Sequence, residues 1–359
     1  MISLSDDDQT KNLVEDISSK TAIPDELKRE LLELSSRIQQ LELVSKFAEI
    51  ESIRSYINWV MKVPFGKYTL DNLDFDEVGS ILDSNHFGLQ DVKDKVMEYL
   101  AIIKLKLQAE NQETIVQKTP VMLFIGIQGI GKTTMVRSIA KALNRKFVKI
   151  SLGGASSVTE IRGIPKGFPQ SEPGLIIKAL INTECMNPVI LLDELDKISD
   201  SGGVRADVMA ALLEILDSEQ NHMFVDRFIN HPIDISKCLF IATANNVGGI
   251  TSALLDRMEI VRFTSYSDED KTQIAKQYLL PKIRKSMGIG EDKLTFDGRV
   301  WPLIIRPLGF DAGIRELERT LSSIARKVAR KIVEGKGEKF EITPENFREF
   351  IPDDFGVYT

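Results

Sequence analysis

The sequence has few residues that form disulfides or bind metals through sulfur or nitrogen. Its 359 residues include two cysteines and three histidines. Cys185 and Cys238 each lie near an apolar stretch, so we expect buried thiols in a reducing compartment. The histidines His86, His222 and His231 lack the spacing of a zinc site. The sequence therefore argues against a disulfide-stapled secreted domain and against a zinc centre.

Long apolar runs and an excess of positive charge are also missing. No run reaches the ~18 residues that a membrane span needs, and the N-terminus MISLSDDDQT lacks the order of a signal peptide. The net charge of -7 argues against nucleic acid or an anionic membrane as the main partner. Hydrophobic residues make up 43%, and the length exceeds that of a single core. We expect a cytoplasmic globular protein of two or three domains.

The first part of the chain favours amphipathic helices. Between residues 11 and about 60, apolar residues recur at spacings of three and four. They are Leu27, Leu31, Leu34, Ile38 and Leu41, followed by Phe47, Ile50, Ile53, Ile57 and Val60. Pro24 sits where a helix can begin, and Pro64 with Gly66 ends the pattern. We expect a helical packing module. A coiled coil between subunits is the alternative, because two to three heptads are too few to distinguish the two.

From about residue 84, helices alternate with short apolar strands. Five segments rich in Val, Ile, Leu and Phe are strand candidates: 121–125, 147–150, 189–192, 239–242 and 260–263. Such alternation implies parallel βαβ units with helices on both faces of the sheet. Helical patterns return in 268–280, 311–334 and 344–350. The predicted fold is an α/β domain with a five-stranded parallel sheet, an N-terminal helical segment and a C-terminal helical subdomain.

The strongest motif is G-x-x-x-x-G-K-T over residues 126–133. It follows the apolar run VMLFI and precedes an amphipathic helix, which is the context of a phosphate-binding loop. Its glycines let backbone N–H groups face the phosphates of ATP or ADP, and the helix N-terminus adds partial positive charge. Lys132 is expected at the β- and γ-phosphates, and the Thr133 hydroxyl on Mg²⁺. The residues assigned to the nucleotide here are Gly126, Ile127, Gln128, Gly129, Ile130, Gly131, Lys132, Thr133 and Thr134.

A second motif ends an apolar run with two acids. Val189-Ile-Leu-Leu is followed by Asp193 and Glu194, about sixty residues after the phosphate loop. A buried strand that ends in two acids places two carboxylates at the same end of the sheet. Such carboxylates can bind a metal ion and activate a water molecule. Asp193 is expected to hold Mg²⁺ and to contact the nucleotide, with Glu194 as the general base. Alone, the pattern would indicate only a strand that ends in solvated acids.

Two further polar residues fit the same site. Asn245 ends an apolar strand and could bind the γ-phosphate or orient water; the alternative is an asparagine that starts a loop. Arg257 could reach the nucleotide of a neighbouring subunit; the alternative is a surface ion pair with Asp256 or Glu259. From the residues alone both assignments stay open.

In chain order these motifs resemble the AAA+ ATPases, and among them the ATPase module of the Lon protease family, the ATP-dependent serine proteases. The likeness covers nearly the whole chain. It rests on the run HFGL at 86–89, KFVKISLGG at 146–154, EIRG at 160–163, LLEILD at 212–217 and GIRELER at 313–319. The helical stretch from Ile53 to Pro64 also resembles the segment that precedes the Lon ATPase.

The resemblance implies specific roles. Asn245 becomes the first sensor and Arg257 the arginine finger that acts on a neighbour's ATP. Arg315 becomes the second sensor, on the C-terminal helical subdomain. His86, Phe87 and Gly88 join the nucleotide site. The family's modules form six-membered homo-oligomeric rings, and the implied domains are 1–65, 66–265 and 266–359.

The resemblance also implies protein substrates. Family members thread unfolded or damaged polypeptide through the ring with an aromatic residue on a loop after the second strand. Phe168 takes that place, so a substrate grip is expected there. Pro169 replaces the aliphatic neighbour and stiffens the loop. The segment after Lys197 also departs from the family pattern, which affects the second pore loop.

No Ser–Lys, Ser–His or Cys–His motif is recognisable, so we do not expect this polypeptide to cut peptides. The sequence stops at Phe355-Gly-Val-Tyr-Thr359, about where a Lon peptidase domain would start. The chain is then either an excised part of a full protease, which we favour, or a free-standing ATPase. The leading function is an ATP-driven unfolding motor. A nucleotide-dependent assembly scaffold or chaperone-like ATPase is the alternative, motivated by the altered Phe168 loop.

Overall fold

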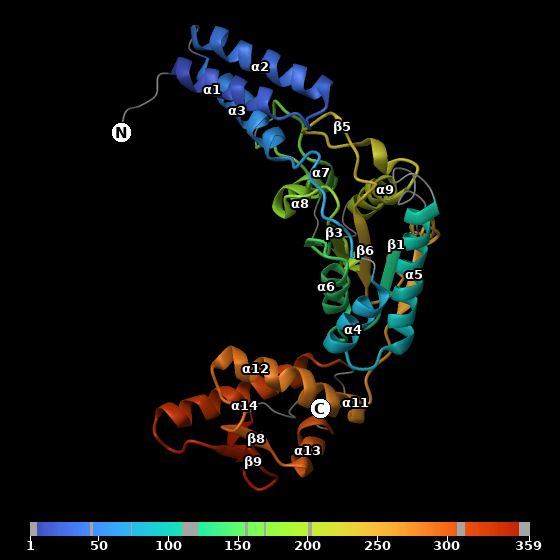
Figure 1. The fold of residues 1–359 in the computed structure, drawn as a ribbon, viewed down its shortest axis with the longest axis vertical. Helices are drawn as coiled ribbons and strands as arrows, with labels where there is room; N and C mark the ends of the chain where they lie inside the picture. The colour runs from blue at the N-terminus through green and yellow to red at the C-terminus, as the bar shows by residue number, and fades with distance from the viewer. Residues whose placement is uncertain are drawn as a thin grey trace. The chain divides into compact units, whose positions relative to one another are not determined.

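The computed structural model describes residues 6–43, 46–72, 74–109, 121–154, 157–168, 170–199, 203–306 and 313–351. Pro169, most of the loop at 199–203 and the C-terminal residues 355–359 lie outside them. The chain forms two compact units, each built from separate segments. The first unit contains residues 1–73, 99–123 and 140–260, and the second contains 74–98, 124–139 and 261–359. Figure 1 shows the ribbon.

The central element is a five-stranded parallel sheet with strand order β2-β3-β6-β1-β7. Its strands are β1 (Val121–Ile125), β2 (Phe147–Ser151), β3 (Val189–Asp193), β6 (Leu239–Ala244) and β7 (Met258–Arg262). Every residue of β1, β3 and β6 is buried, as expected for strands that are covered on both faces. The five predicted strands are therefore confirmed, with ends that differ by one or two residues.

The register of the sheet aligns the polar residues near the strand ends. Ser151 of β2 is the Cα partner of Asp193 of β3, and Lys149 is the partner of Leu191. Leu192 of β3 is paired with Ala242 of β6, one residue before Thr243. Asp193, Thr243 and the end of β2 consequently lie at the same carboxyl edge, where open α/β sheets bind their ligands.

The N-terminal helices belong to the first unit. They are α1 (Asp6–Ser19), α2 (Asp25–Leu43) and α3 (Phe47–Lys62). The helix α2 begins at the predicted proline, since the N–H of Lys28 donates to the Pro24 carbonyl at 2.8 Å. Leu27, Leu31 and Ile38 are fully buried, and α2 packs against α1 and α3. Among the described residues, the apolar stripe thus serves a packing module inside one chain.

The remaining elements of the first unit surround the sheet strands. They are α5 (Gln90–Ala109, shared with the second unit), α7 (Val158–Arg162), α8 (Leu175–Thr183), α9 (Val204–Leu216), β4 (Phe224–Val225), β5 (Pro232–Ile233) and α10 (Ser252–Leu255). Asp226 is fully buried between β4 and β5 and accepts hydrogen bonds from the N–H groups of Gly174, Phe228 and Ile229. Gly174 begins α8, so this carboxylate holds the start of that helix.

The second unit contains the loop after β1, the following helix and the C-terminal helices. Its elements are α4 (Phe75–Asn85), α6 (Lys132–Ala142, shared with the first unit), α11 (Asp268–Ile274), α12 (Leu280–Met287), β8 (Leu294–Phe296), α13 (Trp301–Ile305), α14 (Arg315–Val333), β9 (Phe340–Ile342) and α15 (Phe347–Phe350). A core of buried side chains that includes Trp301, Leu321 and Ile324 joins the C-terminal helices to the small parallel pair β8–β9.

The C-terminal region differs from the sequence prediction at two places. The helix predicted over 268–280 continues to Met287, through a π-helical turn at Ala275–Leu279 that precedes Pro281. Proline has no N–H to donate within a helix, and a wider π-helical turn before it accommodates the missing hydrogen bond. The strands β8 and β9 and the helix α13 were not predicted. Strands of three residues are too short to show a period of two.

Candidate functional site

The phosphate loop connects β1 to α6, as predicted. Gly129 and Gly131 have φ of +79° and +99°, which other residues rarely adopt. A side chain at Gly126 would place its Cβ 2.9 Å from the Cβ of Phe263. Glycine is therefore required at all three positions. The side chain of Ile130 is fully buried, whereas Ile127 and Gln128 are exposed, so the loop offers its backbone to a ligand.

The lysine and threonines of the motif lie at the start of α6. Lys132 Nζ donates to the carbonyl of Gly126 and, at 3.1 Å, to the carbonyl of Ile127. The lysine is thus folded over its own loop. Thr133 is half-buried, and the exposed Thr134 donates its hydroxyl proton to the Gly131 carbonyl at 2.7 Å. These contacts hold the first turn of α6, whose N–H groups form an anion-binding end.

The N-terminus of α14 lies directly on the phosphate loop. The N–H of Ile314 donates to the Gly129 carbonyl at 3.1 Å. A Cβ at Gly129 would lie 2.9 Å from the Cγ of Arg315, and a Cβ at Gly313 would lie 2.7 Å from the Gln128 carbonyl oxygen. The structure therefore brings the predicted second sensor, Arg315, against the loop, with its side chain exposed.

A cavity of about 520 Å³ lies beside the loop, within the second unit. Its lining comes from the end of α4, from α6 and from the C-terminal helices: Ser84, Asn85, His86, Phe87, Gly131, Thr134, Arg137, Ser138, Tyr266, Ile274, Gln277, Tyr278, Leu279, Lys282, Ile314 and Glu318. Its volume falls in the range of small-molecule and cofactor pockets. Gly88 follows in the left-handed region, with φ of +59°, and turns the chain into α5.

His86 is a buried, neutral residue in this cavity wall. Its Nε2 lies 3.0 Å from the Ser138 hydroxyl of α6, and its carbonyl accepts a hydrogen bond from Lys93 at 2.7 Å. Burial, and then the charge of Lys93, lower the pKa of His86 to about 4. Phe87 packs against the C-terminal core. The pair therefore joins the chain before α5 to both α6 and the C-terminal helices.

The two acids at the end of β3 have different surroundings. Asp193 is buried; one of its oxygens accepts the hydroxyl proton of Thr243, and the other lies 2.5 Å from Lys149 Nζ. Glu194 adopts the left-handed conformation, with φ of +60°, and is more exposed. A side chain at Gly153 would place its Cβ 2.7 Å from Glu194 Oε2. Backbone strain of this kind often marks a functional position.

The two remaining polar candidates are placed as follows. Asn245 directly follows β6 and is half-buried. Arg257 precedes β7 and is 41% exposed. Its guanidinium pairs with Asp217 at 3.1 Å and donates to the Ala253 carbonyl at 3.1 Å. The partner within the chain is thus Asp217, not the neighbouring acids named as the sequence-based alternative. The N–H of Glu219 and this arginine keep the pKa of Asp217 below its usual value.

The loop that carries Phe168 is anchored at its base. The N–H of Ile164 donates to the Glu172 carbonyl at 2.9 Å. Lys166 pairs with Glu30 of α2, and its Nζ lies 4.5 Å from the centre of the Tyr56 ring of α3. Phe168 itself is 63% exposed. The loop is therefore tied to the helical module, while its aromatic side chain reaches solvent.

Several residues of these surroundings were not singled out from the sequence. Tyr266 donates its hydroxyl proton to the Ile130 carbonyl at 3.0 Å, and burial raises its pKa to about 12. Lys149 and Thr243 contact Asp193 from the adjacent strands. Lys149 and Thr243 lie on the strands that flank β3, and no local sequence pattern pairs them with Asp193. Tyr266 follows the last strand and carries no pattern of its own.

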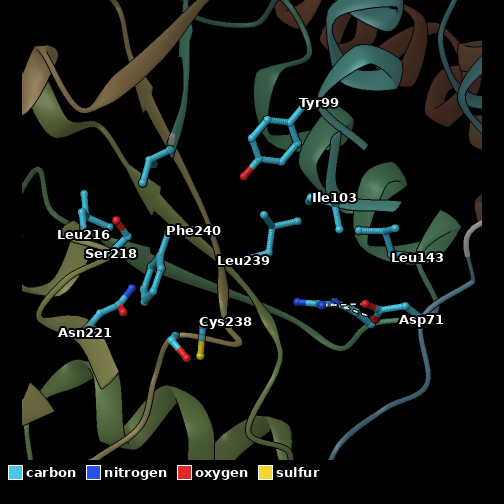
Figure 2. A pocket seen from close by; sticks show the side chains of 13 residues that line it. Asp71, Tyr99, Ile103, Leu143, Leu216, Ser218, Asn221, Cys238, Leu239 and Phe240 are labelled. Carbon is cyan, nitrogen blue, oxygen red and sulfur yellow. Dashed lines mark hydrogen bonds and ion pairs between the residues drawn. The ribbon is translucent and has the colours of Figure 1, made fainter. Parts of the chain in front are cut away.

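A second, small cavity lies in the first unit, at the amino ends of β1 and β6 (Figure 2). It measures about 30 Å³, which is room for one or two water molecules. Arg145 makes two hydrogen bonds of 2.7 Å to Asp71 at its rim. Tyr99 is buried there, which raises the pKa of its hydroxyl. The cavity is too small for a nucleotide, and we assign it to packing.

Other kinds of site are not found among the described residues. No group of three or more His, Cys, Asp or Glu side chains is arranged to hold a metal ion in that part of the chain. Cys185 and Cys238 are buried and unpaired, which confirms the expectation of buried thiols. None of the described helices is both long enough and apolar enough to cross a membrane.

Family models match two consecutive parts of the chain. The model of the ATPase family associated with various cellular activities (AAA) matches residues 122–266. The model of the Lon protease AAA+ ATPase lid domain matches residues 285–340. The first match contains the phosphate loop, Asp193 and Arg257. The second contains all of α14, including Arg315.

Curated relatives match nearly the full length of the chain. A Lon protease of Geobacter metallireducens is 40% identical over 329 residues, which are 92% of this chain and 38% of the relative. Lon protease 1 of Bacillus subtilis is 40% identical over 343 residues, 96% of this chain and 43% of the relative. Lon protease 2 of Thermus thermophilus is 41% identical over 308 residues, 85% of this chain and 38% of the relative.

The chain spans about two-fifths of the length of these curated relatives. Its matched residues include the sheet, the phosphate loop and the C-terminal helices described above. The chain is thus an AAA ATPase with the lid domain of the Lon proteases.

Proposed function

We propose that the chain binds Mg-ATP at residues 126–134 and hydrolyses it with the residues assigned below. The family match supports the activity, and one contact carries the residue-level proposal. Ile314 and Arg315 of α14 lie on Gly129 of the phosphate loop. This contact sets an arginine beside the loop, next to a cavity of nucleoside size whose wall includes His86 and Phe87.

Lys132 and the loop backbone hold the phosphates in this proposal. Without a ligand, Lys132 donates to two carbonyls of its own loop. Phosphate oxygens replace those carbonyls when ATP binds, so the lysine needs no large rearrangement. Arg315 contacts the γ-phosphate, in keeping with its place against Gly129. Charge-assisted hydrogen bonds to phosphate are the strong ones in such a site.

Thr133 and Asp193 are the residues that would hold Mg²⁺. Their hydroxyl and carboxylate oxygens are the ligands that this ion prefers. Asp193 is buried, and the positively charged ammonium of Lys149 already lies beside one of its oxygens. A cation therefore suits this carboxylate. A Mg²⁺ ion held by these two residues would supply positive charge that offsets the charge of the phosphates.

Glu194 accepts the proton of the attacking water, and Asn245 orients that water or the γ-phosphate. Glu194 is more exposed than Asp193, and its carboxylate lies over Gly153, where no side chain blocks it. The nearest described cation with a defined distance is Lys197 Nζ, 3.5 Å away. An accessible carboxylate of this kind is suited to accept a proton from water.

We further infer that the chain works as a subunit of a ring, with protein substrates. Arg257 would stabilise charge on a neighbour's ATP, which its 41% exposure permits. Phe168 would grip unfolded polypeptide, consistent with its 63% exposure on an anchored loop. The similarity to proteases supports this motor over an assembly scaffold.

The Glu194→Gln variant tests the proposed chemistry. It should bind ATP as tightly as the parent chain but hydrolyse it about 10²–10⁴-fold more slowly, because general-base catalysis contributes that much. Binding is measured with a fluorescent ATP analogue, and turnover by phosphate release. The control, Glu184→Gln, changes an acid at the end of α8 and should hydrolyse normally. Parental turnover in Glu194→Gln would remove Glu194 from the role of base.

A further inference from the structure

A lysine of the neighbouring strand lies against the carboxylate that we assign to Mg²⁺. Lys149 Nζ is 2.5 Å from Asp193 Oδ2. The Asp193 side chain is 11% exposed and that of Lys149 is 41% exposed. Because Lys149 is paired with Leu191, it is the diagonal neighbour of Asp193 on the same face of the sheet. A long side chain spans that diagonal, so the sheet register itself builds the contact.

The second oxygen of Asp193 also has a partner from the chain. The Thr243 hydroxyl donates its proton to Asp193 Oδ1 and accepts the N–H of Glu194 at 3.2 Å. A hydroxyl has one proton to donate, so these two bonds fix its direction. Thr243 is buried in β6, with 1% of its surface exposed. The carboxylate is therefore oriented by one neighbouring strand and neutralised by the other.

Burial explains why a positive charge is needed here when no metal is bound. A carboxylate removed from water is costly unless it is paired and hydrogen-bonded. Lys149 supplies the pairing charge, whereas Lys197 is directed at Glu194. A divalent cation on Asp193 would supply positive charge in place of the ammonium and would repel it. The lysine and the metal thus compete for one carboxylate.

We propose that Lys149 is a positioning residue that neutralises Asp193 between turnovers and is displaced when a divalent cation binds with the nucleotide. The inference rests on the proposed function, which supplies that cation. Two consequences follow. The metal-free protein is stabilised by Lys149, and its affinity for the metal is lowered by it, so that metal and product are released more readily.

The first experiment measures the affinity for a divalent cation. Mn²⁺ serves as the probe, and the free ion is followed by electron paramagnetic resonance in the presence of saturating ADP. Lys149→Met keeps the apolar stem and removes the charge, so Mn²⁺ should bind about ten-fold more tightly, within the usual range of coupling between two sites. Lys149→Arg keeps the charge and should stay near the parent value. Unchanged or weaker Mn²⁺ binding in Lys149→Met would overturn the proposal.

Lys146→Met is the matched control for this experiment. It removes a lysine that immediately precedes β2, at the opposite end of the strand from Ser151. Its net charge changes by the same amount, so a general loss of positive charge would act equally in both variants. Mn²⁺ affinity should rise in Lys149→Met alone; an equal rise in both variants would refute a specific role for Lys149.

The second experiment needs neither nucleotide nor metal. Thermal unfolding is followed in EDTA for Lys149→Met in two backgrounds, the parent chain and Asp193→Asn. The substitution should lower the melting temperature in the parent and leave it nearly unchanged in Asp193→Asn, which no longer carries the charge. Equal loss in both backgrounds would contradict the ion pair. Lys149→Gln replaces Lys149→Met in both experiments if the latter does not fold.

Failure of this inference can be told apart from failure of the proposed function. If the parent chain fails to bind ADP, or if Lys132→Ala binds it as tightly as the parent, the nucleotide site is wrong, and the EDTA comparison alone still decides the role of Lys149. If ADP binds to the parent but Mn²⁺ affinity is the same in Lys149→Met, only the competition between lysine and metal is disproved.

Discussion

At the scale of single residues, the loop at 126–133 depends on a glycine outside its own motif. Gly313 precedes Ile314 and Arg315, and its Cβ position lies against backbone atoms of the loop: 2.7 Å from the Gln128 oxygen and 2.8 Å from the Gly129 carbonyl carbon. Backbone atoms give way less easily than the end of a flexible side chain. The contact between α14 and the loop therefore requires a residue without a side chain.

We expect Gly313→Ala to push the start of α14 away from the phosphate loop. Stability should fall by about 1–3 kcal/mol, as for other overpacked sites, and ADP affinity should fall as Arg315 moves. Urea unfolding and titration with a fluorescent ADP analogue measure the two effects. Gly298→Ala is the control, because nothing lies within 4 Å of its Cβ position. Normal ADP affinity in Gly313→Ala would argue against a role for this contact in binding.

A second prediction at this scale concerns acid stability. The pKa of His86 is lowered from 6.5 to about 4. Above pH 6.5 the imidazole is neutral in both the folded and the unfolded state, so it does not affect the pH dependence there. As the pH falls from about 6.5 toward 4, the unfolded state binds a proton that the folded state does not. Stability is then lost, by at most roughly 3 kcal/mol.

The variant His86→Gln removes this proton uptake. Its free energy of unfolding should consequently decline less between pH 7.5 and 5 than that of the parent chain, measured by urea unfolding at both values. His222→Gln, at an exposed position, should decline like the parent. If His86→Gln follows the parent curve, His86 does not titrate as the structure implies.

The positions of the loop between β1 and α6 and of the two acids at the end of β3 were predictable, because spacing and strand context identify them. The neighbours of those residues were not. Lys149 and Thr243 reach Asp193 through the strand order β2-β3-β6, which no local pattern encodes. Asp217, the partner of Arg257, lies forty residues earlier in the sequence. Contacts of this kind depend on topology, so sequence reasoning named the wrong neighbours for Arg257.

At the scale of elements, one buried acid organises the base of the Phe168 loop. Asp226 Oδ2 accepts the N–H of Gly174, while Oδ1 accepts the N–H groups of Phe228 and Ile229. Burial raises the pKa of Asp226, and the three hydrogen bonds oppose that rise. A Cβ at Gly163 would also lie 2.9 Å from this carboxylate. Both ends of the loop therefore meet at one side chain.

We expect Asp226→Asn to loosen this loop. One oxygen becomes an NH₂ group, which faces at least one N–H group that it cannot accept, at a cost of about 1–3 kcal/mol. Hydrogen exchange of residues 164–174 should quicken, and urea should unfold the variant earlier. Asp234→Asn changes an exposed acid that accepts one N–H, from Ser236, and serves as the control. Unaltered exchange in Asp226→Asn would show that the loop is held elsewhere.

The long helices and the sheet strands were predictable as elements, because each presents a clear period over enough residues. The short elements were not. The strands β8 and β9 have three residues each, and their pairing depends on the C-terminal core. The continuation of α12 past Pro281 was also missed, since a proline usually ends a helix and only the preceding π-helical turn permits it here.

At the scale of the whole molecule, an arginine that acts across a subunit boundary would make copies of the chain cooperate. If Arg257 acts on a neighbour's ATP, then two inactive variants can restore each other. Arg257→Ala has an intact phosphate loop, whereas Lys132→Ala has an intact arginine. In a ring assembled from both variants, some subunits with an intact phosphate loop lie next to subunits with an intact Arg257.

We expect the mixture to hydrolyse ATP faster than the mean of the two variants alone, since such an arginine contributes roughly 10³–10⁵ in rate. Turnover is measured over a range of mixing ratios, with light scattering to follow assembly. Mixing Lys132→Ala with Glu194→Gln is the control, because neither of those chains combines an intact loop with a base. A mixture that only averages the two rates would place Arg257 within its own subunit.

The chain passes from one compact unit to the other at five points, and four of these lie inside regular elements. These four fall between residues 98 and 99 of α5, 123 and 124 of β1, 139 and 140 of α6, and 260 and 261 of β7. Neither unit is a continuous piece of the gene, so no single deletion can excise one and leave the other whole. A recombination event that exchanges this ATPase between proteins must therefore carry both units together, and a ribosome must have synthesised β7 before either unit can be completed.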